Sequence, residues 1–149
     1  MEPVSRPIQS FPELDDWIPG AEPWNICRVP LAQRHLDSKK PKVLLCHDMA
    51  GGYHQDRFVQ GVFEAPSYRF QFWNLVDIFV YFSHTCVTLP PVVWVSAAHR
   101  EGVRVLGNII TEGDFGELQN LHMIYGPILN DASKSSFSPH YADILGISS

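Results

Sequence analysis

The sequence predicts an α/β fold built on a parallel sheet. Three apolar segments, at residues 43–46, 76–82 and 103–110, have the length and composition of buried strands. A helical pattern at residues 92–100 separates the second segment from the third, and the connection between the first and second is also long enough for a crossover. Strands that alternate with such connections form βαβ units, in which the strands are parallel and the crossovers right-handed.

The two connections are each predicted to contain a helix. A short helix is expected at residues 67–74, where two aromatic residues lie one turn apart. The second, at residues 92–100, follows a loop stiffened by two prolines, and Gly102 is its expected end, because glycine readily adopts the conformation that closes a helix. One face of this second helix is expected to be formed by Val92, Val95 and His99.

Composition divides the chain into three parts. Residues 1–42 hold seven of the twelve prolines, which predicts an extended lead-in and linker, and residues 43–112 form the structured block. Residues 113–149 contain a helical pattern and then a serine-rich tail, for which we expect little structure. The lead-in is expected to pack through Phe11, Leu14, Trp17, Trp24 and Ile26, and the helical pattern consists of Leu118, Leu121, Ile124 and Tyr125.

Composition and charge exclude several classes of partner. The 149 residues carry a formal net charge of −5 and no basic stripe, so we expect no nucleic acid partner. No apolar run approaches the ~20 residues of a membrane span, and the first residues do not look like a signal peptide, so no membrane association is expected. The three cysteines are widely spaced, which predicts reduced thiols and a cytosolic protein.

Polar side chains follow each apolar segment at its C-terminal end, where enzymes with parallel strands form their pockets. His47 and Asp48 follow the first segment, and they either bind a polar ligand or tie down the loop behind them. His84 follows the second segment and Glu112 the third. Glycoside hydrolysis usually requires two carboxyl groups, and Asp48 and Glu112 are candidates for such a pair.

Other residues near these ends have both a functional and a structural interpretation. Tyr53 follows a glycine pair and either stacks on a ligand or simply follows a turn. Tyr81 shares a strand face with Asp77, whose carboxylate we expect to be paired for structural reasons. Trp94 is more typical of a core residue than of a sugar platform. The histidines and cysteines lack the spacing of a zinc site, so no metal is expected.

Two longer segments carry a family resemblance. KVLLCHDMAGGYHQDRFVQG and WNLVDIFVYFSHTCVTLPPVVWVSAAHREGVRVLGNIITE resemble the start of the catalytic barrel of glycoside hydrolase family 85, the cytosolic endo-β-N-acetylglucosaminidases. The resemblance covers about residues 8–112 and implies an incomplete (β/α)8 TIM barrel with about three parallel strands. It also implies hydrolysis of the chitobiose core of N-glycans in the cytosol, with no metal or other cofactor.

The resemblance implies a substrate-assisted mechanism, in which an Asn and a Glu two positions later act after the fourth strand. No Asn of this chain is followed two positions later by Glu, and Gly113 stands where the family has Trp. We therefore expect a truncated, inactive member without catalytic residues; a non-catalytic glycan- or protein-binding remnant and a degraded product are the alternatives. The positions that match the family's N-glycan pocket are His47, Asp48, Tyr53, Tyr81, His84 and Glu112.

Overall fold

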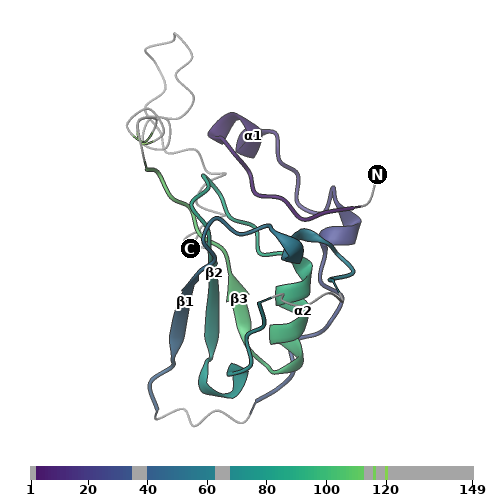
Figure 1. Ribbon diagram of the computed structural model, residues 1–149, viewed down its shortest axis with the longest axis vertical. Coiled ribbons are helices and arrows are strands. Elements are labelled where there is room, and N and C mark those ends of the chain that lie inside the picture. The colour runs from purple at the N-terminus through teal and green to yellow at the C-terminus, as the bar shows by residue number, and fades with distance from the viewer. Residues whose placement is uncertain (1–2, 35–39, 63–67, 113–115, 117–119, 121–149) are drawn as a thin grey trace.

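The computed structural model describes residues 3–34, 40–62 and 68–112, together with Gly116 and Asn120. Its centre is a three-stranded parallel sheet with the order β1-β2-β3, and the helix α2 packs against one face (Figure 1). The predicted α/β class with parallel strands is therefore confirmed. The described residues do not form a closed barrel, and the helical pattern and tail predicted within residues 113–149 lie outside them, apart from Gly116 and Asn120.

The third strand is shorter than predicted. β1 spans Leu44–Asp48, β2 spans Ile78–Phe82, and β3 spans only Arg104–Leu106 instead of continuing to residue 110. Beyond β3 the chain leaves β2 and runs antiparallel to the loop that follows β2, with a bridge between Val87 and Ile109. The backbone hydrogen bonds of residues 108–110 go to this loop, at 2.8–3.1 Å.

One of the two predicted helices is present. The helix α2 spans Val92–Arg100 as predicted, and Gly102, with φ of +69°, closes it. The helix predicted at residues 67–74 is wrong, because the described part of this segment has no regular secondary structure before a short 3₁₀ turn at Trp73–Leu75. Phe70 and Trp73 nevertheless touch, with ring centroids 4.6 Å apart, since both pack onto the sheet.

The buried face of α2 differs from the predicted one. Val95 and His99 are only partly buried, whereas Trp94 is 6% exposed. The Trp94 ring stacks on Phe79 of β2, with centroids 5.4 Å apart, and this contact turns the face that carries Trp94 toward the sheet. The residues buried on the helix are Val92, Trp94 and Ala98.

The lead-in is folded onto the body of the chain. The helix α1 spans Phe11–Asp15, and its first turn is capped by the Ser10 side chain, which accepts a hydrogen bond from the N–H of Glu13. A bridge between Ile8 and Val87 ties this segment to the loop after β2. The lead-in is therefore more structured than the extended segment predicted from its prolines.

Three of the five predicted anchors of the lead-in are confirmed. Phe11 and Leu14 are buried, and Trp17 packs against the same cluster. Trp24 and Ile26 are 43% and 49% exposed, so the prediction is wrong for these two. The cluster also contains Ile8 of the lead-in, and it is completed by Cys86 and Val87 from the loop after β2.

The sheet face opposite α2 is open. Side chains alternate along β1, so Leu44 and Cys46 point away from α2, as Leu106 of β3 does. Leu44 is 55% exposed and Leu106 is 48% exposed. Apolar side chains of β1 and β3 therefore meet water on this face, although parallel sheets normally have both faces covered. In the described parts of the chain, neither helix has the length or apolar character needed to cross a bilayer.

Candidate functional site

Three polar side chains meet at the carboxyl end of the sheet. Asp48 is the last residue of β1, His84 lies two residues after β2, and Glu112 lies beyond β3. Nε2 of His84 is 3.3 Å from Oδ2 of Asp48, and Nδ1 of His84 is 2.9 Å from Oε1 of Glu112. Parallel strands end at the same edge of a sheet, and this edge is where the three residues meet. We call these three residues the strand-end cluster.

The charge of the strand-end cluster depends on His84. Both of its ring nitrogens face a carboxylate, and the imidazolium ion donates from both nitrogens at once. The hydrogen bond with Glu112, followed by the one with Asp48, raises the pKa of His84 above its usual value. The N–H of Ala50, followed by His84, lowers the pKa of Asp48. The three side chains are 46–60% exposed, so their hydrogen-bonding groups are accessible to a ligand in solvent.

A tight turn after β1 positions Asp48. The N–H of Ala50 donates to Oδ1 of Asp48 at 2.8 Å. All four residues from 50 to 53 have positive φ, which the two glycines adopt without strain. A side chain at Gly52 would overlap the hydroxyl group of Tyr81. Asp48 therefore ties down its own loop, and its second oxygen remains directed to His84.

Tyr53 and Tyr81 lie on the α2 side of the sheet, away from the strand-end cluster. The fully buried Tyr81 hydroxyl donates to Oδ2 of Asp56 at 2.7 Å and accepts the N–H of Tyr53 at 2.9 Å. The Tyr53 hydroxyl donates to the carbonyl of Leu89 at 2.7 Å. Burial raises the pKa of both phenols, so both stay protonated and donate. These bonds hold the loop after β1 against the sheet.

Asp56 is a residue of this region that the sequence analysis missed. It lies in a 3₁₀ turn at Gln55–Arg57, and its Oδ2 accepts hydrogen bonds from the Tyr81 hydroxyl and from Nε1 of Trp94, the latter at 2.9 Å. A carboxylate among aromatic rings requires such donors, because desolvation of an unpaired charge is costly. No spacing in the sequence signalled this arrangement, since the three residues come from three separate segments.

Two structural interpretations made from the sequence are confirmed. Trp94 is a core residue, stacked on the sheet as described above. Asp77 accepts the N–H of Val43 at 2.8 Å, and its other oxygen lies 3.9 Å from the Arg34 guanidinium group. Asp77 precedes β2 and therefore lies at the opposite end of the sheet from the strand-end cluster.

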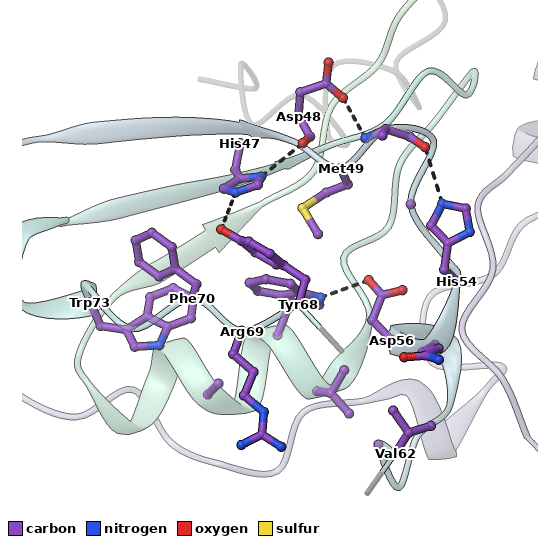
Figure 2. Close-up of a pocket in the computed structure, with 17 residues that line it drawn as sticks. His47, Asp48, Met49, His54, Asp56, Val62, Tyr68, Arg69, Phe70 and Trp73 are labelled. Atoms are coloured by element: carbon purple, nitrogen blue, oxygen red, sulfur yellow. Dashed lines mark hydrogen bonds between the residues drawn. The ribbon is translucent and has the colours of Figure 1, made fainter. Parts of the chain in front are cut away.

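A cavity of about 830 Å³ lies beside β1 on the α2 side. Figure 2 shows His47 and Tyr68 pointing toward one another, while the Asp48 side chain points away from them. Nε2 of His47 is 2.6 Å from the Tyr68 hydroxyl oxygen. Asp48 also lines the cavity, so the cavity and the strand-end cluster share this residue. The aromatic lining is formed by Tyr68, Phe70, Trp73 and Trp94.

The site offers hydrogen-bonding groups and aromatic surface. Among the residues that the structure describes, no group of three His, Cys, Asp or Glu side chains is arranged to hold a metal ion. The exposed carboxylates and imidazole of the strand-end cluster suit the hydroxyl groups of a polar ligand, and aromatic rings suit its apolar faces. The six predicted site residues divide into two groups. Asp48, His84 and Glu112 form the strand-end cluster. The other three, His47, Tyr53 and Tyr81, lie on the other side of the sheet.

Comparisons with known proteins identify relatives of this chain. The model of Glycosyl hydrolase family 85 matches residues 53–143. This range begins and ends later than the family resemblance described above, which covers about residues 8–112. The chain is 55% identical over 119 residues to a cytosolic endo-β-N-acetylglucosaminidase of Gallus gallus. It is 49% identical over 118 residues to that of Homo sapiens, and 45% identical over 120 residues to cytosolic endo-β-N-acetylglucosaminidase 1 of Arabidopsis thaliana.

The coverage of these alignments is uneven. They include 77–78% of this chain, but the chain spans only 16–18% of the length of these relatives. No solved structure matches the chain significantly. The family match extends over more than half of the chain and includes β2, α2 and β3. The chain therefore belongs to glycosyl hydrolase family 85.

Proposed function

We propose that the chain forms the first βα units of a (β/α)8 glycosidase domain and that it binds N-glycans. Family membership supports this, as do the relatives named cytosolic endo-β-N-acetylglucosaminidase. Consecutive units of such a barrel have parallel neighbouring strands with helices on the outer face, which is the arrangement of β1, β2, β3 and α2. The names of the relatives also support a cytosolic location. The proposed substrate class is glycoprotein N-glycans, recognised at the chitobiose core.

The convergence of Asp48, His84 and Glu112 carries the proposal. Asp48 ends β1, His84 follows β2 and Glu112 follows β3, so the three residues meet at the carboxyl edge of the sheet, where barrel enzymes form their substrate site. We assign direct contact with sugar hydroxyl groups to these three side chains. Tyr53 and Tyr81 support the site indirectly, because their hydrogen bonds hold the loop that begins at Asp48.

A polypeptide of these 149 residues is expected to bind glycan without hydrolysing it. The resemblance assigns catalysis to an Asn-x-Glu segment, and no Asn of this chain has Glu two positions later. Asp48 of the strand-end cluster does not supply the general acid in place of that segment. The lowered pKa of Asp48 keeps it ionised at neutral pH, whereas a general acid must hold a proton there.

Calorimetric titration with a high-mannose glycopeptide tests the binding, and chromatography of the same samples tests hydrolysis. We expect binding that His84→Ala weakens about tenfold, the usual effect of losing hydrogen bonds with charged groups. Ile18→Ala is the control, because Ile18 is 67% exposed in the lead-in and lies outside the site. A folded chain that binds no glycopeptide would overturn the binding proposal, and release of free glycan would overturn the proposed inactivity.

The open sheet face favours protein binding as a second candidate function. Leu44 and Leu106 expose apolar side chains there, and within the described sheet β1 and β3 each have one unpaired edge. Open edges and apolar patches are surfaces on which another polypeptide can add. Light scattering over a concentration series tests this: self-association that Leu44→Asp reduces supports it. A monomer at every concentration, with a cooperative thermal transition, contradicts it.

A further inference from the structure

We propose that Tyr68 is a stacking platform for the outer sugars of a glycan whose core contacts the strand-end cluster, and that His47 holds the Tyr68 ring in position. This inference rests on the proposed function and extends the site into the cavity shown in Figure 2. It gives His47 a positioning role, although His47 does not belong to the strand-end cluster. On this proposal, the shape of the cavity helps to determine which glycans the chain prefers.

Tyr68 is fixed by its neighbours and yet remains open to a ligand. Its ring stacks on Trp94, with centroids 5.9 Å apart and planes at 25°. Its hydroxyl oxygen lies 2.6 Å from Nε2 of His47. The residue is nevertheless 58% exposed, so one face of a preorganised ring is available to a ligand. A ring held in this way loses little conformational entropy when a sugar packs on it.

His47 links this ring to the strand-end cluster. It belongs to β1, where its Nδ1 lies 3.1 Å from the carbonyl oxygen of Asp48, and its ring lies 5.8 Å from that of Phe79. The strand therefore fixes the position of Tyr68 relative to Asp48, the next residue of the chain. Asp48 also lines the cavity, but its carboxylate points to the other side of the sheet, so a ligand that contacts both places must pass over the carboxyl end of β1.

The chemistry of the cavity suits a neutral ligand with many hydroxyl groups. Its volume of about 830 Å³ lies within the range of known ligand pockets, about 300–1,000 Å³. Asp56 lines it, and among the described residues only Oδ2 of this carboxylate takes part in hydrogen bonds, so Oδ1 is available to accept from a hydroxyl group. Aromatic surface beside such an acceptor fits the apolar and polar faces of a pyranose ring.

Two ligands of different length separate this inference from the proposed function. Chitobiose represents the core alone, and a free high-mannose glycan adds outer sugars to the same core. We expect Tyr68→Ala to weaken binding of the long glycan about tenfold, as the loss of an aromatic contact does, and to leave chitobiose binding unchanged. Tyr68→Phe keeps the ring but loses the bond to His47, so it should have a smaller effect of the same kind, as should His47→Ala.

Phe72→Ala is the matched control for Tyr68→Ala. Phe72 is 63% exposed in the same segment but does not line the cavity, so its replacement should change neither affinity. Equal losses for both ligands in Tyr68→Ala, or an unchanged affinity for the long glycan, would overturn the inference while chitobiose binding still supports the proposed function. A folded wild-type chain that binds neither ligand would overturn the proposed function, and this inference with it.

Discussion

Replacing Tyr81 with phenylalanine removes one hydroxyl group that joins the sheet to the loop after β1. This hydroxyl donates to Asp56 at 2.7 Å and accepts the N–H of Tyr53 at 2.9 Å. A hydrogen bond to a charged group contributes about 1.5–3 kcal/mol, and a buried N–H without a partner costs about 1–3 kcal/mol. Because Tyr53 is only partly buried and the two bonds share one oxygen, we expect Tyr81→Phe to lower the free energy of unfolding by about 2–4 kcal/mol.

Urea unfolding followed by tryptophan fluorescence measures this change. Tyr53→Phe is the matched control, because its hydroxyl makes one hydrogen bond, to the neutral carbonyl of Leu89 at 2.7 Å, and its loss should cost about 0.5–1.5 kcal/mol. A change below about 0.5 kcal/mol for Tyr81→Phe, which is typical of surface substitutions, would refute this reasoning. So would a cost for Tyr53→Phe that equals or exceeds the cost for Tyr81→Phe.

The remaining predictions concern the strand-end cluster, the end of β3 and the core. In an NMR titration the pKa of His84 should lie above 6.5, and Glu112→Gln should lower it more than Asp48→Asn. Because folding raises this pKa, the stabilisation that comes from protonating His84 should be present below about pH 6.5, while Asp48 remains ionised, and disappear as the pH rises through the folded value; a pKa at or below 6.5 contradicts this. Gly107→Ala should markedly lower the melting temperature, because its Cβ would overlap a carbonyl of the loop after β2, and an unchanged melting temperature contradicts that packing. Trp94→Ala should cost about 3–5 kcal/mol in the same urea assay, and a cost below 1 kcal/mol would argue against its core position.

Elements whose signals lie within one segment were predictable. The helix α2 has prolines before it and Gly102 after it, so its bounds follow from local chemistry. The end of β3 depends instead on the close approach of Gly107 to a loop distant in sequence. The segment before β2 is rich in aromatic residues and was misread as a helix, because packing against the sheet overrides a weak local preference.

The candidate site was predictable to the extent that it depends on strand ends. Asp48 and His84 meet because parallel strands finish at one edge. Side chains alternate along β1, so His47 and Asp48 point to opposite faces of the sheet. The family resemblance alone does not separate these two residues. Asp56 and Tyr68 were not predicted, because they lie outside the strands and their positions depend on contacts with Trp94 and His47.

We propose that a polypeptide of these 149 residues binds N-glycan at the strand-end cluster and does not hydrolyse it. One NMR sample of the chain with a high-mannose glycopeptide reports both parts. We expect the ring signals of His84 to shift on titration, while the anomeric signals remain those of the intact glycopeptide. Unchanged His84 signals at saturating glycopeptide, or new anomeric signals from a released reducing end, would contradict it.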